Sequence, residues 1–156
     1  MYMYKAFLEI GVLMVKFSGD YFKDEANEGL LNIARSMNMD EKFAITTVIL
    51  DLNDVTSMTL ANTDRARVYY WEREIFATFD HPEKDAAAHL QAIKYFNVLP
   101  ENRALKERYL ARLLKVHSGM IGVPVIDNHF NDLADLLQSL DLLELLPLLA
   151  DGWREI

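Results

Sequence analysis

The side chains best suited to bind a metal or carry a proton are histidines, and their spacing does not form a metal site. The chain has four of them, His81, His89, His117 and His129. None forms a His-x-x-x-His or His-Glu-x-x-His pair, in which two ligands share one helix face. His129 is close in sequence to Asp127 and Asp132, a group able to bind a metal or orient a proton. We interpret it instead as a loop histidine near a helix start, and predict no metal site.

The residues needed for nucleophilic or nucleotide chemistry are also missing. Cysteine is absent, and no Gly-x-Ser-x-Gly turn exists to hold a nucleophilic serine. No Gly-x-Gly-x-x-Gly or Gly-Lys-Ser/Thr loop is present to cradle a phosphate. Asp51 ends a predicted strand, as the phosphorylated aspartate of receiver domains does, but Val15-Lys16-Phe17-Ser18 lacks the acidic pair that such domains need. We therefore predict that the chain is not an enzyme and uses no cofactor.

The composition favours one cytoplasmic domain. With 156 residues, of which 51% are hydrophobic and 26% charged, the chain fits a single globular domain over residues 1–156. A net charge of −8 repels phosphate backbones, which argues against nucleic-acid binding. No apolar run is long enough to cross a membrane, and Lys5 and Glu9 interrupt the segment where a signal peptide would be apolar.

The strands that would position functional side chains are predicted from β-branched and aromatic runs. Two short strands lie within Tyr4–Phe17, joined by a bend at Gly11 and followed by a turn at Ser18-Gly19-Asp20. Further strands are predicted at Ala44–Leu52, Ile93–Leu99 and Val123–Ile126.

Helices are predicted between these strands, where apolar residues recur every three or four positions. They lie at 24–37, 60–79, 83–90, 101–117 and 133–140. Strands that alternate with helices build a sheet with crossover connections, and the N-terminal hairpin adds an antiparallel pair. The predicted fold is therefore α/β, with a mixed sheet of four to five strands and crossover helices.

Two segments, Gly11–Asp20 and Val48–Met58, are similar to parts of a known family. The first resembles the second strand and following turn of STAS domains, the anti-sigma factor antagonists, and the second resembles their central strand and the loop after it. The order of predicted elements is similar over residues 4–140. The resemblance implies a STAS-like fold and a bacterial signalling protein. Such a protein would regulate by docking a protein partner of the kinase or sigma-factor regulator type.

The loop after the central strand departs from the family at the residue that is usually phosphorylated. The family continues Asp-Ser-Ser-Gly there, and phosphate on the second serine blocks docking. This chain reads Thr59-Leu60-Ala61-Asn62, so Ala61 stands where that serine would be and the usual switch is predicted to be absent. Thr59 and Thr63 are nearby hydroxyls, although Thr59 also suits a helix cap. The docking loop that the resemblance implies comprises Asp54, Thr56, Ser57, Thr59, Ala61, Asn62 and Thr63.

A small-molecule or lipid carrier on the same fold is the alternative function. Large aromatic side chains commonly line ligand pockets. Here the pocket would lie between the helices and be lined by Tyr69, Trp71, Phe76, Phe79 and Tyr95. A fully packed interior would count against this hypothesis.

The C-terminal segment is a second predicted interaction surface. From about residue 141 we expect a leucine-rich helical extension, with leucines at positions 142, 143, 145, 146, 148 and 149. These leucines cannot all face one core, so some are expected to bury against a partner helix or a second copy in a homodimer. Arg108, Arg112 and Lys115 share one face of the helix at 101–117, which we interpret as a solvated face. The sequence thus predicts a non-enzymatic regulatory protein-interaction module.

Overall fold

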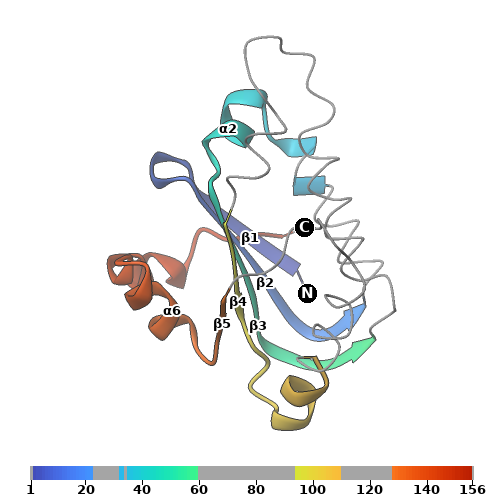
Figure 1. The fold of residues 1–156 in the computed structure, drawn as a ribbon. Helices are drawn as coiled ribbons and strands as arrows, with labels where there is room; N and C mark the ends of the chain where they lie inside the picture. The colour runs from blue at the N-terminus through green and yellow to red at the C-terminus, as the bar shows by residue number, and fades with distance from the viewer. Residues whose placement is uncertain (1, 23–31, 34, 60–93, 110–127, 156) are drawn as a thin grey trace, which may run out of the picture.

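The computed structural model describes residues 2–22, 32–33, 35–59, 94–109 and 128–155. Within these residues six strands form one sheet, in the order β5-β4-β3-β2-β1-β6 (Figure 1). Their bounds are β1 Tyr2–Phe7, β2 Val12–Phe22, β3 Thr47–Thr59, β4 Lys94–Val98, β5 Asn128–Phe130 and β6 Arg154–Glu155. Strands β2 to β5 pair in parallel, whereas β1 pairs antiparallel with both β2 and β6. The predicted α/β fold with a mixed sheet is confirmed, but the sheet has six strands where four to five were predicted.

The N-terminal hairpin turns at Gly11, as predicted. A short 3-10 helix, η1 (Leu8–Ile10), follows β1, and Gly11 has a φ of 72°, in the left-handed region that glycine adopts without strain. The Gly11 carbonyl accepts hydrogen bonds from the backbone N–H groups of Thr46 and Thr47, at 2.9 and 3.0 Å. A Cβ at Gly11 would lie 2.7 Å from the carbonyl oxygen of Ala44, so the space also requires glycine.

The two central strands are longer at their carboxyl ends than the sequence predicted. Strand β2 continues through the expected turn at Ser18-Gly19-Asp20, and β3 continues past Leu52 to Thr59. Two register shifts in the β2–β3 pairing, between Lys16 and Ser18 and between Gly19 and Asp20, let the strands stay paired through polar residues. The predicted turn at residues 18–20 and the predicted end of the central strand were therefore wrong.

The central strand also begins later than predicted, because a short helix precedes it. Helix α2 (Met39–Ala44) starts at a capping box: the Asn38 side chain accepts the Glu41 N–H at 2.9 Å. The Glu41 carboxylate in turn accepts the Asn38 N–H at 3.1 Å. The Asn-x-x-Glu spacing is a recognised helix-start signal, and it competes with the β-branched residues that follow.

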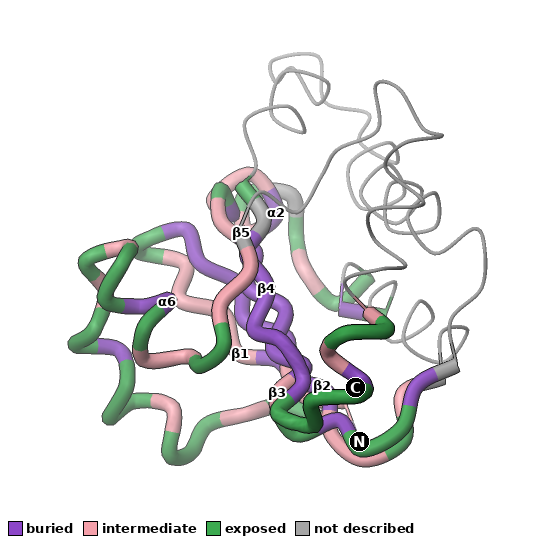
Figure 2. The backbone as a smooth tube through the Cα atoms, turned by 60° about the horizontal axis from the view of Figure 1, so that its bottom comes forward, coloured by how far each residue is buried: buried purple, intermediate pink, exposed green. Residues whose placement is uncertain are grey.

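The sheet has an apolar core on each face. One core joins Leu13, Val15, Val48 and Leu50 to Ile33 and to Leu105, which lies in the helical segment 103–109. The other core is closed by α6 (Leu133–Ser139) and the 3-10 helix η2 (Leu143–Ala150), whose Leu136, Leu137 and Leu145 pack on Val12, Met14 and Ile49. Figure 2 shows buried residues running along the central strands, with shorter buried stretches in the α6 layer.

The predicted helix at 133–140 is confirmed, with Asp132 as its N-cap. The short strand before it lies at Asn128–Phe130, where the sequence predicted the lead into the helix, whereas the predicted strand at 123–126 lies outside the described residues. The predicted helices at 60–79 and 83–90 also lie outside them, and the one at 101–117 is described as helical only over 103–109. In the described part of the chain no helix is long and apolar enough to span a membrane.

Candidate docking site at the strand ends

The carboxyl end of the sheet narrows to two strands. The last residue pair of β3 and β4 is Asp51 with Val98, and β1 begins at Tyr2, opposite Phe17. The pairs from Ser18 with Asp54 to Phe22 with Thr59 therefore extend beyond both neighbouring strands. We call these two segments, 18–22 and 54–59, the β2–β3 ribbon. Figure 1 shows the ends of β2 and β3 curving away from the α6 side of the sheet.

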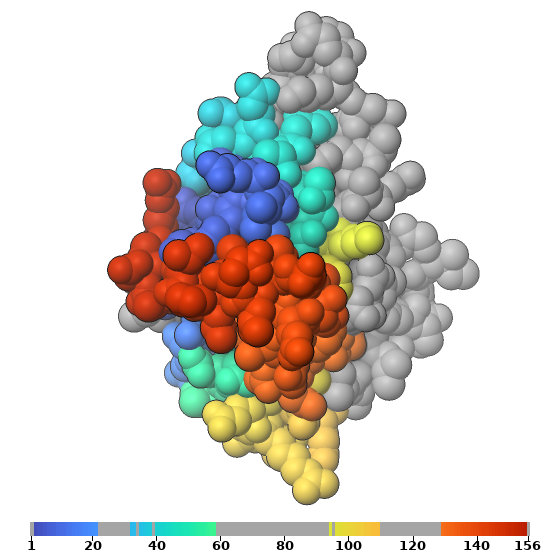
Figure 3. All heavy atoms as spheres, turned by 90° about the vertical axis from the view of Figure 1, so that its left-hand side faces the viewer, coloured from blue at the N-terminus to red at the C-terminus, as the bar shows by residue number. Residues whose placement is uncertain are grey.

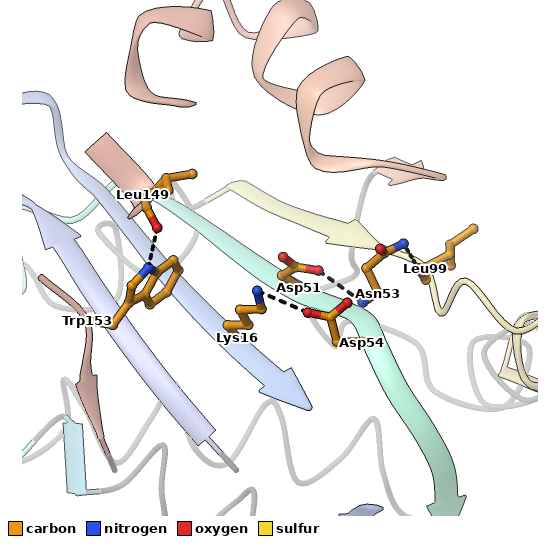
Figure 4. Close-up of polar contacts among 7 residues, drawn as sticks. All are labelled: Lys16, Asp51, Asn53, Asp54, Leu99, Leu149 and Trp153. Carbon is orange, nitrogen blue, oxygen red and sulfur yellow. Dashed lines mark hydrogen bonds and ion pairs between the residues drawn. The ribbon is translucent and has the colours of Figure 1, made fainter. Parts of the chain in front are cut away.

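A small group of charged side chains lies at the base of the ribbon. The Lys16 ammonium pairs with the Asp54 carboxylate at 3.0 Å, and both side chains are partly exposed (Figure 4). Asp51 is only 5% exposed, and its Oδ1 accepts the backbone N–H of Asn53 at 3.0 Å. Burial raises the pKa of Asp51, an effect that the Asn53 hydrogen bond and the Lys16 charge partly oppose.

Asn53 connects the carboxyl ends of three parallel strands. Its side-chain amide donates to the carbonyls of Leu99 and Asn131, both at 3.2 Å, and Figure 4 shows the contact with Leu99. Its own carbonyl accepts the N–H of Glu101 at 3.1 Å. Leu99 and Asn131 directly follow β4 and β5, so Asn53 holds the base of the ribbon against the rest of the sheet. This role of Asn53 is not visible in the sequence, because its two partners lie 46 and 78 residues away along the chain.

The predicted docking residues that the structure describes lie on a strand and not in a loop. Asp54, Thr56 and Ser57 are exposed, whereas Val55 and Met58 are buried beneath them. The Ser57 hydroxyl donates to the Asp20 carboxylate across the ribbon.

Arg108, interpreted from sequence as part of a solvated basic face, donates to the Met58 carbonyl at 3.0 Å. This contact ties the ribbon to the segment 103–109.

The other predicted docking residues are the last residue of β3 and three residues that follow it in the sequence. Thr59 is the last residue of β3, so its backbone is that of a strand. Ala61, Asn62 and Thr63 lie outside the described residues. The docking role of the whole set stays a prediction.

The predicted aromatic pocket also lies mostly outside the described residues, which exclude Tyr69, Trp71, Phe76 and Phe79. Tyr95 belongs to β4, opposite Val48.

The structure contains a different cavity of about 230 Å³ between β1, the segment 36–41 and the C-terminal residues. It is lined by Tyr4, Lys5, Ala6, Leu8, Ser36, Met37, Glu41, Gly152 and Arg154. Most of its polar groups already bond within the chain: the Ser36 hydroxyl donates to the Ile33 carbonyl at 2.7 Å, and Lys5 donates to two backbone carbonyls.

His129, interpreted from sequence as a loop histidine near Asp127 and Asp132, belongs to a strand and not to a loop. His129 lies in β5, opposite Asn97 of β4, and Asp132 caps α6 by accepting the Asp135 N–H at 2.8 Å. No group of three or more acidic, histidine or cysteine side chains in the described ranges could hold a metal ion.

Asn97 is fully buried and donates to the Tyr109 hydroxyl at 3.0 Å, a polar core contact that sequence periodicity did not reveal.

No protein-family model matches the sequence, and no curated protein is significantly similar to it. The fold is similar to that of a solved structure described as the anti-sigma factor antagonist SpoIIAA in its unphosphorylated form, with a TM-score of 0.46. The aligned residues are 10% identical and cover 92% of this chain and 98% of that chain. At this level of identity the similarity concerns the fold alone and assigns no function.

Proposed function

We propose that this chain is a non-enzymatic regulatory module that docks a protein partner on the exposed face of the β2–β3 ribbon. The observation that supports the proposal best is the arrangement of residues 54–58. Asp54, Thr56 and Ser57 are exposed above the buried Val55 and Met58. A polar surface on a buried apolar base can contact a partner without rearranging the core.

The ribbon is held in position from two sides, which favours recognition. Asn53 bonds the base of the ribbon to the segments after β4 and β5, and Arg108 bonds the Met58 carbonyl near its end. A preorganised surface loses less conformational entropy when it binds than a mobile loop does. The resemblance of Val48–Met58 to an anti-sigma factor antagonist strand suggests a kinase or a sigma-factor regulator as the partner. With Ala61 at the usual serine position, we propose that docking is not controlled by phosphorylation there.

The proposal is tested by partner capture with a matched pair of threonine variants. Thr56→Arg places a large cation on the ribbon, and Thr46→Arg places the same cation at another exposed position, just before the opposite end of β3. Wild-type protein and both variants are immobilised, and proteins captured from a lysate of the source cells are quantified by mass spectrometry. We expect a stoichiometric protein that wild type and Thr46→Arg retain and Thr56→Arg loses. Equal capture by all three would exclude the ribbon as the docking surface.

Small-molecule binding is the second candidate, supported by the cavity beside β1. Its volume of about 230 Å³ and its lining of both polar and apolar residues suit a small molecule better than a lipid. Native mass spectrometry of the purified chain would detect such a ligand. The substitution Ala6→Phe, which fills the cavity, should release it. A chain that carries no ligand, and binds none from a metabolite extract, would remove this candidate.

A further inference from the structure

The 3-10 helix η2 leaves three of its leucines exposed at the surface. Leu145 is buried, and Leu142 and Leu149 pack against the same core. Three other leucines of η2 are about half exposed, Leu143 at 45%, Leu146 at 40% and Leu148 at 51%. We call these three residues the leucine ridge. The α6–η2 layer that carries it lies across the middle of the face shown in Figure 3.

The backbone beneath the ridge is held by hydrogen bonds to other parts of the chain. The Lys5 ammonium donates to the carbonyls of Leu148 and Asp151, and the Trp153 indole donates to the Leu149 carbonyl at 2.7 Å. Before the ridge, the Leu142 N–H bonds the Leu137 carbonyl at 2.8 Å. The exposed side chains are therefore presented on a preorganised backbone.

The ridge lies in an acidic segment and is bordered in sequence by Asp141, Glu144 and Asp151, while the Lys5 ammonium of β1 bonds the backbone carbonyls of Leu148 and Asp151. Residues 131–153 contain no lysine or arginine. Their five acids, all exposed, are Asp132, Asp135, Asp141, Glu144 and Asp151. An anionic membrane surface would be repelled by such a border, because membrane-surface helices carry lysine and arginine around their apolar face. A two-fold contact between two copies would place each acidic border near the other and is disfavoured for the same reason.

We propose that the leucine ridge binds a basic amphipathic helix of a partner protein. The apolar face of that helix would cover Leu143, Leu146 and Leu148, and lysine or arginine side chains on its flanks would face Glu144 and the other border acids. Apolar contact and charge complementarity both select this occupant. The ridge lies on the α6 layer and not on the β2–β3 ribbon, so this proposal does not depend on docking at the ribbon.

The binding test uses two fluorescein-labelled helical peptides of equal length, one built of leucine and lysine and the other of leucine and glutamate. Fluorescence anisotropy with the full chain should show binding of the leucine–lysine peptide alone, weakening as the salt concentration rises. Replacing all three ridge leucines by glutamine should weaken binding by at least about tenfold. Glu144→Lys should weaken it and reduce its salt dependence, whereas Glu101→Lys, an equal charge change outside the 131–153 segment, should leave both unchanged.

Several results would overturn the proposal. The first is absence of leucine–lysine binding, or equal binding of both peptides. The second is unchanged affinity in the triple glutamine variant, which would mean that the peptide binds elsewhere by charge alone. The third is a concentration-dependent dimer in sedimentation that the triple variant abolishes, since the ridge would then bind a second copy. Thermal unfolding of each variant shows whether it is folded, and a folded single variant, Leu146→Gln, serves if the triple variant is not.

Discussion

Replacing Asn53 by alanine should loosen the carboxyl end of the sheet without affecting the apolar core. The side-chain amide of Asn53 makes two hydrogen bonds, to the Leu99 and Asn131 carbonyls. Alanine removes both and keeps the strand backbone of β3, including the Asn53 carbonyl that accepts the Glu101 N–H. The substitution therefore isolates the contacts that join the ends of β3, β4 and β5.

The two hydrogen bonds of the Asn53 side chain contribute unequally to the free energy of unfolding. A hydrogen bond between neutral groups contributes about 0.5–1.5 kcal/mol, so losing both costs about 1–3 kcal/mol. Asn131 is exposed, so water can replace the amide there, whereas Leu99 is buried and its carbonyl loses a partner that is harder to replace. We therefore expect a loss of about 2 kcal/mol. In a chain of this length that loss lowers Tm by about 4–8 °C.

Urea denaturation followed by circular dichroism measures the change, with Asn32→Ala as a matched control. Asn32 is exposed, and its side-chain oxygen accepts a surface hydrogen bond from Arg35. Replacing it should therefore change the free energy of unfolding by less than about 0.5 kcal/mol. Hydrogen exchange gives a local readout: the Glu101 and Leu99 amides should exchange faster in Asn53→Ala, and the Leu136 amide of α6 should not. If Asn53→Ala unfolds at the same urea concentration as Asn32→Ala, Asn53 does not hold the strand ends together.

Two further predictions concern the hairpin and the buried carboxyl. Gly11→Ala should destabilise the chain by more than about 2 kcal/mol, because the left-handed φ strains alanine and its Cβ would lie 2.7 Å from the Ala44 carbonyl oxygen. A thermal shift no larger than that of Gly19→Ala, where φ is also 72° but no atom lies within 4 Å, would show that the close contact costs nothing. Because burial raises the pKa of Asp51, wild type should lose stability as pH rises from the ordinary aspartate range, about 4, through the raised value. The Asp51→Asn side chain does not titrate, so the unfolding free energy of this variant relative to wild type should rise across that pH window and then level off. A difference between the two proteins that does not change with pH would contradict a raised pKa for Asp51.

The parts of the fold that the sequence predicted are those set by local apolar patterns. The apolar runs around Val12–Phe17 and Val48–Leu52 became central strands, and the leucine spacing at 133–140 became α6. The pattern failed at Asn53-Asp54, where two polar residues suggested a strand end. Beyond them Val55 and Met58 are still buried, and the shifted register of β2 against β3 makes this possible. A register shift depends on the partner strand, so one strand read alone could not predict it.

The candidate site was predicted less completely than the fold because its contacts are between distant residues. Lys16 and Asp54 were both visible in the sequence, but only the parallel register of β2 and β3 brings them within 3.0 Å. Strand β6 was missed for a similar reason. Its two polar residues carry no strand signal, and Arg154 and Glu155 are placed by pairing with Tyr4 and Met3.

The base of the β2–β3 ribbon lies on the same face of the sheet as the α6–η2 layer, which carries the leucine ridge. Side chains alternate along a strand, so Lys16 and Asp51 lie on the same face as Met14 and Ile49, the face that α6 and η2 cover. The ribbon continues β2 and β3, and the layer that carries the ridge packs on the same two strands through Leu145. Asn53 bonds the base of the ribbon to the segment after β4, and Lys5 of β1 bonds the backbone of the ridge. A ligand shifts a conformational equilibrium only if it binds the two conformations with different affinity, and the two proposed surfaces share no residue through which one ligand would contact the site of the other. We therefore expect a partner on the ribbon and a helix on the ridge to bind at the same time without changing each other's affinity. A module of this kind would bring two proteins together and would not switch between them.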